Sequence, residues 1–184
     1  METLKGQFLI AMPSMLDFNF SQTVTCLSEH TADGAMGIVV NRVIPSLMAG
    51  TIFKELKIDH TASAAEIPIH LGGPVHENEI FILHGQPFSW EGCLRITPTL
   101  ALSNTIDLIE AIARGEGPEA FLISLGCAGW GPGQLESEIS QNAWLTCPVD
   151  EKIIFESNVD TRWEEAVRVL GIDPVLLSDT PGHA

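Results

Sequence analysis

The stretch that decides the fold is "AFLISLGCAGWGPGQ", residues Ala120–Gln134. Its first part, Ala120–Gly126, is apolar throughout, which is typical of a central strand covered on both faces. Its second part, Leu125–Gln134, contains four glycines, a cysteine, a tryptophan and a proline in front of an expected helix. This density of glycine and proline predicts a tight structural turn between the strand and the helix.

A catalytic role for Cys127 is one alternative. The thiol would stand at the end of the strand and before a helix N-terminus, where the helix dipole lowers a thiol pKa. However, Glu136 and Glu138 lie in the first turns of that helix and would raise the pKa of a nearby thiol. The segment Gly126–Gly129 also lacks the G-x-S-x-G spacing of a nucleophile elbow.

A loop for a small ligand is the other alternative. Gly126 and Gly131 have the spacing of a Walker loop, but proline and glycine follow where lysine and a hydroxyl residue are required. Residues 126–144 contain no lysine or arginine that could hold an anion. If the loop does take a ligand, Cys127 and Trp130 are its candidate contacts.

Strands and helices are interleaved along the rest of the chain. The polar loop Thr31–Gly34 between two β-rich runs predicts a hairpin. The expected strands are Gly6–Met12, Thr23–His30, Ala35–Arg42, Ile67–Gly73, Glu79–Gly85, Cys93–Pro98, Ala120–Gly126 and Lys152–Phe155. The expected helices are Thr51–Ile58, Pro98–Arg114, one after the glycine-rich stretch that buries Leu135, Ile139 and Ala143, and Thr161–Ile172. This order predicts a mixed sheet in an α+β or α/β domain.

Several local signals place the ends of these helices. Thr97 can cap the helix Pro98–Arg114, and Gly115 is suited to end it. Thr161 and Glu164 have the spacing of a capping box. We expect the tail at residues 178–184 to be loosely held.

Composition sets the class of protein. The chain has 184 residues, of which 45% are hydrophobic, and this fits one globular domain with its own core. Its 9 Lys+Arg and 24 Asp+Glu give a formal net charge of −15, which disfavours nucleic acids and anionic membranes. The apolar run Phe8–Met12 is too short to span a bilayer and lacks the basic flank of a signal peptide. The four cysteines show no ligand spacing and fit a reducing compartment. We therefore expect a cytoplasmic monomer that binds neither nucleic acid nor membrane.

Two polar pairs, Glu29-His30 and Asn41-Arg42, form a second candidate site. They lie at strand ends of the expected hairpin, where they would converge. A carboxylate beside an imidazole can orient a base, and a guanidinium can grip a carboxylate or a phosphate. The interpretation favoured here is a cluster of hydrogen bonds and ion pairs at the loop ends.

Three histidines, His70, His76 and His84, form a third candidate site. The first and last belong to different expected strands, and His76 belongs to a turn. The motif "HENEI" is not the HExxH of zinc proteases, and no cysteine or carboxylate stands at ligand spacing. We therefore expect no metal and no cofactor.

Several motifs together resemble the bacterial YqgE/AlgH family over nearly the whole chain from Gly6 onward. They are "GQFLIAMPSM", "GAMGIVVNR", "LGGPV", "FILHG", "GWGPGQLESEISQNAWL" and the terminal "GHA", of which Gly129–Leu145 is the most specific. The resemblance implies an α+β fold with a bent, branched mixed β-sheet and a small barrel-like portion, surrounded by helices. Family members are described as uncharacterised proteins or as proposed transcriptional regulators, and the family implies no catalytic residue.

The chain departs from that family at three places. Relatives often have Asp-Pro-Asn-Phe at Asp17–Phe20, so the turn there can differ. Relatives often have cysteine at Ser28, so a redox or nucleophilic role of that cysteine cannot apply here. Cys127 is often tyrosine in relatives, which weakens its interpretation as a nucleophile.

The functional expectation is a single domain, residues 1–184, that binds a protein or a small molecule in a regulatory role and is not an enzyme. The candidate contacts are Glu29, His30, Asn41, Arg42, Cys127 and Trp130. The alternative is an enzyme or a small-ligand or nucleotide-binding module. It would use Gly126–Gly133 or the cluster of Glu29, His30 and Arg42.

Overall fold

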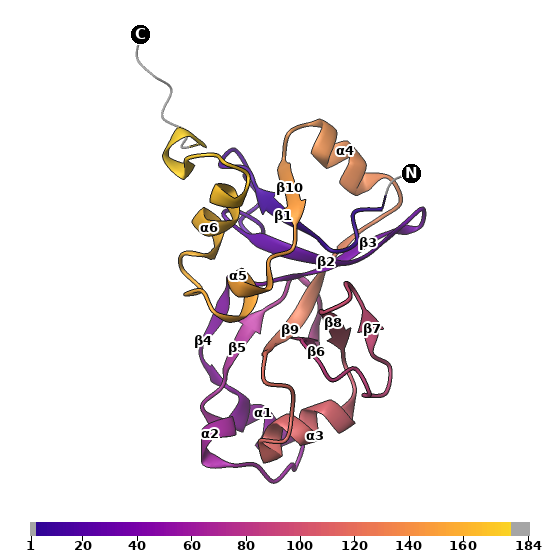
Figure 1. Ribbon diagram of the computed structural model, residues 1–184, viewed down its shortest axis with the longest axis vertical. Helices are drawn as coiled ribbons and strands as arrows, with labels where there is room; N and C mark the ends of the chain where they lie inside the picture. Colours follow the sequence, from indigo (N-terminus) through magenta and orange to yellow (C-terminus); the bar gives the residue numbers. More distant parts are fainter. Residues whose placement is uncertain (1–2, 178–184) are drawn as a thin grey trace.

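The structure is a computed structural model that describes residues 3–177 (Figure 1). The strands are β1 (Gln7–Ala11), β2 (Val24–Thr31), β3 (Gly34–Val39), β4 (Val43–Met48), β5 (Pro68–Leu71), β6 (Val75–His84), β7 (Leu94–Arg95), β8 (Ala101–Ser103), β9 (Phe121–Trp130) and β10 (Trp144–Pro148). The helices are α1 (Ala49–Glu55), α2 (Ala62–Ala65), α3 (Ile106–Arg114), α4 (Gln134–Ser140), α5 (Glu151–Phe155), α6 (Arg162–Val169) and the short 3-10 helix η1 (Pro174–Leu177). A curled, half-barrel sheet with these helices around it confirms the predicted α+β class. The tail that we expected to be loosely held lies outside the described residues.

The sheet branches at β9. The first half of β9 pairs in parallel with β5 and antiparallel with β6, since Leu125 lies opposite both Leu71 and Ile80. Its second half pairs with β3, where Trp130 lies opposite Ala35. The strand order is therefore β10-β1-β2-β3-β9-β6-β8-β7, with β4 attached through β5. The apolar segment that predicted a central strand is thus at the centre of the sheet.

The glycine-rich stretch is mostly strand, so the prediction of a turn is wrong as far as Trp130. β9 continues through Gly126 and Gly129, and the turn into α4 is confined to Gly131–Gly133. Gly126 has φ +73°, and a Cβ atom there would lie 2.4 Å from the carbonyl oxygen of Gly73. Glycine is needed because two backbones touch where the sheet branches.

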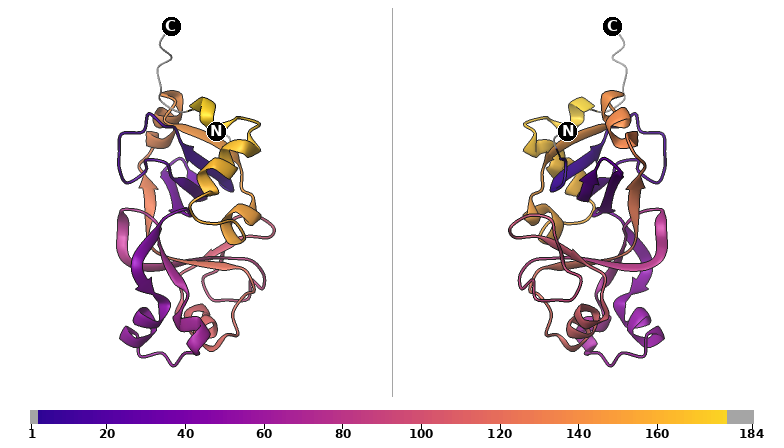
Figure 2. Two further views of the ribbon diagram at one scale, coloured as in Figure 1. Left: turned by 90° about the vertical axis from the view of Figure 1, so that its left-hand side faces the viewer. Right: turned by 90° about the vertical axis from the view of Figure 1, so that its right-hand side faces the viewer.

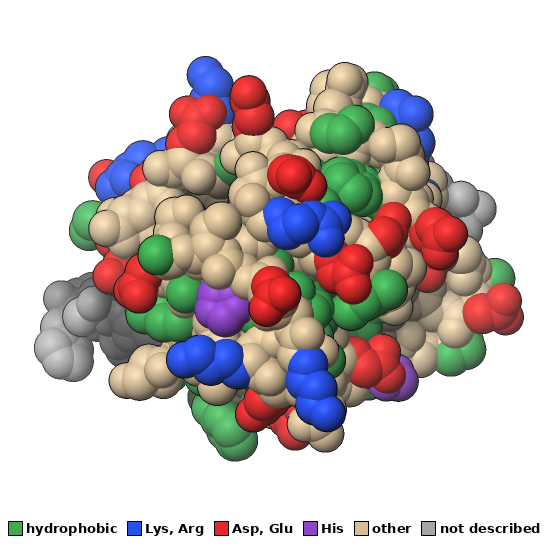
Figure 3. All heavy atoms as spheres, turned by 90° about the horizontal axis from the view of Figure 1, so that it is seen from below, with side chains coloured by type: hydrophobic (Ala, Val, Ile, Leu, Met, Phe, Trp, Pro, Cys, Tyr) green, Lys and Arg blue, Asp and Glu red, His purple; other side chains and the backbone are tan. Residues whose placement is uncertain are grey.

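The helices gather at two ends of the molecule (Figures 1 and 2). Helices α1, α2 and α3 lie together at one end, where residues such as Phe53 and Leu108 pack with Ile82 and Ile123 of the sheet. Helices α4 and α6 lie at the other end. Seen from the α1–α3 end, acidic and basic side chains are mixed over the surface (Figure 3).

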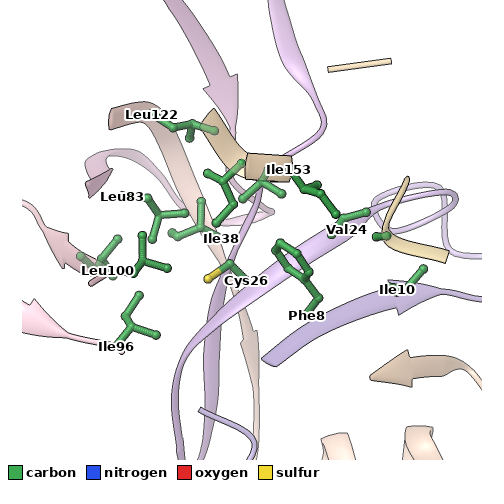
Figure 4. Close-up of a cluster of buried hydrophobic side chains, with 14 of the residues drawn as sticks. Phe8, Ile10, Val24, Cys26, Ile38, Leu83, Ile96, Leu100, Leu122 and Ile153 are labelled. Atoms are coloured by element: carbon green, nitrogen blue, oxygen red, sulfur yellow. The ribbon is translucent and has the colours of Figure 1, made fainter. Parts of the chain in front are cut away.

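Both faces of β1 are buried, which explains why its sequence is continuously apolar. Phe8 and Ile10 point into the largest hydrophobic cluster, together with Cys26 and Ile38 (Figure 4). Their neighbours Leu9 and Ala11 point to the opposite face and pack in a cluster under α4. Since successive side chains of a strand alternate between faces, one strand joins two cores.

The expected helix Pro98–Arg114 is wrong in its first half. Ala101–Ser103 forms β8, which pairs with β6, and α3 begins only at Ile106. Thr97 does not cap a helix. Its hydroxyl accepts from the amide of Leu100 and thereby closes the turn between β7 and β8. The apolar residues of this segment fit the periodicity of a helix and that of a strand, and pairing with β6 makes the segment a strand.

The expected strand Lys152–Phe155 is also wrong, because the segment forms helix α5. The side chain of Asp150 accepts a hydrogen bond from the amide of Lys152 at 3.0 Å and caps the helix. Ile153 and Ile154 are both buried, as in a strand covered on two faces. Only the cap distinguishes the two structures in such a short apolar run.

The other predicted elements are confirmed, with ends that differ by a few residues. The helix expected to bury Leu135, Ile139 and Ala143 is α4, but it buries Leu135 alone and ends at Ser140, before Ala143. The hairpin is β2 and β3, and α3 ends at Gly115, whose φ is +76°. The capping box of Thr161 and Glu164 is wrong, since the Thr161 hydroxyl lies 2.6 Å from a carboxylate oxygen of Glu165.

Candidate functional site

The two polar pairs of the hairpin do not converge. In an antiparallel hairpin, residues beside the turn and residues at the open end lie at opposite ends of the ladder. Glu29 and His30 lie beside the turn, whereas Asn41 and Arg42 follow β3 at the open end, next to Val24. The six-residue rise from Val24 to His30 corresponds to about 20 Å. The prediction that one site contains all four residues is therefore wrong.

The imidazole of His30 is held in place by two hydrogen bonds. The amide of Leu4 donates to Nδ1 at 2.9 Å, so the ring proton resides on Nε2, which donates to Oε1 of Glu136 at 3.0 Å. A hydrogen bond from its own backbone amide, and to a smaller extent the hydrogen bond with His30, lower the pKa of Glu136. Glu29 is exposed, so the carboxylate that orients His30 is the one on α4. Both ring nitrogens are used in holding the fold.

Trp130 ends β9 in an aromatic cluster. The centroid of its indole ring lies 6.0 Å from that of the Trp144 indole and 5.9 Å from that of the Phe20 phenyl ring. The indole N–H groups of Trp130 and Trp144 both donate to the same carboxylate oxygen of Glu138, at 2.9 and 2.8 Å. Trp130 is 5% exposed. It is therefore a core residue with a satisfied N–H group rather than a ligand platform.

Cys127 lies within β9, opposite Val75, and not in front of a helix. Its side chain is buried, and burial, together with the charge of Glu79, raises the pKa of its thiol. The expected rise in pKa is present, but burial rather than Glu136 and Glu138 is its main cause. A buried thiol with a raised pKa is a poor nucleophile.

Asn41 and Arg42 organise the loop that precedes β2. Asn41 accepts from the amide of Val24 and donates to the carbonyl of Gln22, both at 2.8 Å. Arg42 donates from Nη1 to the carbonyl of Asn19 and from Nη2 to that of Ser21, also at 2.8 Å. Two of the five guanidinium N–H groups are used in this way, and the others remain for additional contacts.

Arg42 also lines a polar cavity of about 340 Å³, which we call the Arg42 cleft. Its lining residues are Ser21, Gln22, Asn41, Arg42, Val159, Asp160, Trp163 and Glu164. The cleft contains one guanidinium and two carboxylates. Arg42 is half-buried, and burial lowers its pKa from the usual value, although a guanidinium keeps its charge in proteins.

Arg162 is a buried cation that the sequence analysis missed. It is 7% exposed, and its Nη1 donates to the carbonyl of Val40 and lies 3.3 Å from Nε2 of His70. Because a guanidinium only donates, His70 accepts with Nε2 and is neutral. Burial and then the charge of Arg162 lower the pKa of His70 to about 4. An arginine in the first turn of a helix opposes the dipole, and this was the available signal.

The three predicted histidines are separate in the structure. His70 contacts Arg162, His84 contacts Ser103, and the exposed His76 pairs with Glu79 at 3.1 Å. Among residues 3–177, no group of three or more histidine, cysteine or acidic side chains could hold a metal ion. Within the same residues, none of the helices combines the length and apolarity needed to cross a bilayer.

Comparison with known proteins identifies a family and its fold. A family model described as AlgH-like matches residues 8–175. A UPF0301 protein of Desulforapulum autotrophicum is 51% identical over 181 residues, covering 98% of this chain and 96% of its own length. A UPF0301 protein of Paracoccus denitrificans is 46% identical over 184 residues, covering 98% of this chain and 97% of its own length.

Two solved structures share the fold. The solution structure of the AlgH protein from Pseudomonas aeruginosa aligns with a TM-score of 0.82 at 47% identity, covering 99% of this chain and 96% of that one. The crystal structure of protein DIP2367 from Corynebacterium diphtheriae aligns with a TM-score of 0.74 at 20% identity, covering 96% of this chain and 91% of that one. The second likeness concerns the fold alone.

Proposed function

The chain belongs to the AlgH-like family, and from this premise we propose that it acts by binding a ligand in the Arg42 cleft rather than by catalysing a reaction. The observation that carries the proposal is that residues of both positive and negative charge line one cavity. Arg42, Asp160 and Glu164 line the same cavity.

The surroundings of the other candidate residues support binding over catalysis. His30 uses both ring nitrogens in structural hydrogen bonds, and Trp130 uses its N–H group in the same way. Cys127 is buried. Arg42 alone among these combines partial exposure, a permanent charge and an adjoining cavity.

The charges of the cleft define the class of ligand. A carboxylate would accept hydrogen bonds from the remaining N–H groups of Arg42, and an ammonium group would pair with Asp160, since Glu164 already pairs with Arg168 at 3.0 Å. A small zwitterion such as an amino acid or a short peptide carries both groups. A phosphate or a nucleotide fits less well, because the two carboxylates and the net charge of −15 repel it.

The proposal includes a setting for this binding. We infer that residues 1–184 act as one cytoplasmic domain, since β9 belongs to both halves of the sheet and the four cysteines are free thiols. The domain acts as a monomer in a regulatory role, and its partner is the ligand itself or a protein that presents a peptide end. Direct nucleic-acid binding is disfavoured by the charge of the chain.

A titration of ¹⁵N-labelled protein with dipeptides tests the proposal. We expect a free dipeptide to shift the backbone amides of Gln22, Arg42 and Trp163 at concentrations up to about 10 mM. Its N-acetylated and C-amidated forms should bind at least about fivefold more weakly, because each lacks one charge.

Variants assign the effect to the cleft. Asp160→Asn removes one carboxylate without touching the bonds of Arg42 to the loop, and it should weaken binding about fivefold. Glu110→Gln on α3 is the matched control, because it also removes a carboxylate but lies outside the cleft. Shifts that spread over the surface, or equal binding of charged and capped dipeptides, would contradict the proposal.

A further inference from the structure

A second group of reactive side chains meets at the end of β6, away from the Arg42 cleft. His84 is the last residue of β6, Ser103 is the last of β8, and Cys93 directly precedes β7. Nε2 of His84 lies 2.9 Å from the Ser103 hydroxyl and 4.0 Å from the Cys93 sulfur. One imidazole nitrogen therefore faces two nucleophiles.

The position of the imidazole proton follows from the partners. Nδ1 of His84 lies 2.7 Å from the carbonyl oxygen of Gly85, which can only accept. The ring proton is thus on Nδ1, and Nε2 presents a lone pair to the hydroxyl and the thiol. Burial lowers the pKa of His84, against the smaller effect of Gly85, so the ring stays neutral at neutral pH. A nucleophile, a base and a group that orients the base are the elements of nucleophile activation.

Cys93 differs from the other three cysteines of the chain. Cys26, Cys127 and Cys147 are at most 2% exposed, and burial raises the pKa of each thiol. Cys93 is partly exposed and has the imidazole beside it. Ser103 is 2% exposed, so solvent-borne reagents reach the sulfur rather than the hydroxyl.

We propose that Cys93 is a modification site, at which His84 acts as the base and a small uncharged electrophile of the peroxide class oxidises the sulfur. His84 takes the thiol proton on Nε2, and the thiolate attacks one oxygen of hydrogen peroxide. The S–O bond forms, the O–O bond breaks, and the leaving hydroxide takes the proton from His84 to become water. Sulfur is oxidised by two electrons to the sulfenic acid, and peroxide is reduced.

The surroundings fit a small neutral reagent. A cavity of about 240 Å³ lies beside the cluster and is lined by residues that include Gly92, Leu94 and Ser103, but not Cys93 or His84. The reagent therefore reaches the sulfur through the partly exposed surface of Cys93. The net charge of −15 repels anionic oxidants but leaves hydrogen peroxide unaffected.

Trapping with dimedone and peptide mass spectrometry tests the proposal. After treatment with hydrogen peroxide, we expect the adduct on Cys93 and none of comparable rate on the other thiols. Ser103→Ala removes the hydroxyl that competes for Nε2 and should accelerate the reaction about threefold. His84→Asn removes the base and should slow it about tenfold, which is less than the roughly 10²–10⁴-fold typical of general-base catalysis because the contact is long.

Controls separate reactivity from unfolding. Cys93→Ser should abolish the adduct, and Cys147→Ser should leave it unchanged. Thermal unfolding identifies variants that fold, and if His84→Asn does not fold, the acceleration in Ser103→Ala decides the question. Equal labelling of all four cysteines, or a folded Ser103→Ala variant that reacts at the wild-type rate, would overturn the proposal.

Discussion

One carboxylate oxygen joins the two tryptophans beside α4. Glu138 accepts from both indole N–H groups, of Trp130 at 2.9 Å and of Trp144 at 2.8 Å. In Glu138→Ala, both buried donors lose that acceptor, and an unsatisfied buried donor costs about 1–3 kcal/mol. We expect urea unfolding to show a free energy of unfolding lower by about 2–4 kcal/mol.

The control for this variant is Glu110→Ala on α3. Glu110 lies 3.8 Å from Arg114 in an exposed ion pair, which is worth less than about 1 kcal/mol. A similar small loss in both variants would mean that water replaces Glu138 at the two indoles. Tryptophan emission should change only in the Glu138 variant.

His70 gives the stability a specific pH dependence. Its pKa is about 4 in the folded chain and 6.5 ordinarily, so between these values the unfolded chain binds more protons. Stability therefore rises with pH in this window and is lost as the pH falls from 6.5 toward 4, by about 1–3 kcal/mol. His84, whose pKa is also lowered, adds a loss of the same sign.

Unfolding measured from pH 7 to pH 4.5 checks this dependence. His70→Gln keeps an acceptor for Arg162 but cannot take up the proton, so its stability should fall less steeply with pH than that of the wild type. His76→Gln is the control, because the side chain of His76 is 58% exposed. An unchanged slope in His70→Gln would contradict the assignment.

At the residue scale, the sequence predicted polar groups better than their partners. Asn41 and Arg42 were singled out as candidate contacts, and both line the Arg42 cleft, while their role in binding stays a prediction. The partners of His30 and Arg162 were not predictable, because Glu136 is 106 positions from His30 and Val40 is 122 positions from Arg162. Only the path of the sheet brings such distant residues together.

At the scale of elements, β9 can approach the backbone of Gly73 closely because residue 126 is a glycine. A Cβ atom at Gly126 would lie 2.4 Å from the Gly73 carbonyl oxygen, and the φ of +73° is itself unfavourable for alanine. Gly126→Ala must therefore push β9 away from the connection between β5 and β6, in which Gly73 lies. We expect a loss of about 3 kcal/mol or more in the free energy of unfolding, measured with urea.

Gly133→Ala is the matched control for this prediction. Gly133 has nearly the same φ, +72°, but a Cβ atom at this position would meet no atom within 4 Å. Its substitution should cost only the backbone strain, about 1 kcal/mol. If both variants lose the same stability, steric contact at the branch is not the reason for glycine at position 126.

The errors at the element scale have a common physical origin. Residues Ala101–Ser103 and Lys152–Phe155 are short apolar runs that fit a strand or a helix equally well. Pairing with β6 made the first a strand, and the side-chain cap of Asp150 favoured a helix for the second. The β2–β3 hairpin was predicted correctly, because the polar loop Thr31–Gly34 between two β-rich runs marks a turn.

At the scale of the whole molecule, the local pattern predicted a mixed sheet in an α+β or α/β domain, whereas the α+β class and the branching of the sheet came from the family resemblance. β9 takes part in two ladders on one edge, β5 and then β3, and residue periodicity carries no information about such a change of partner. The resemblance to a family supplied the branched sheet, and the close approach of the backbones at Gly72, Gly73 and Gly126 gives its physical basis.

The charge of the whole molecule leads to a prediction about salt. At a net charge of −15 the folded chain repels itself, and this repulsion extends over a Debye length of about 30 Å at 0.01 M salt but only about 8 Å at 0.15 M. Salt also weakens the exposed ion pairs of Arg114 and Arg168, yet each is worth less than about 1 kcal/mol. Screening of repulsion should dominate, so we expect Tm at pH 7 to rise by about 2–6 °C between these salt concentrations, measured by calorimetry.

An uncharged solute at equal osmolality controls for effects other than screening. A Tm that falls with salt would mean that attractive pairs outweigh the net charge, and the argument against anionic ligands in the Arg42 cleft would then lose its electrostatic basis.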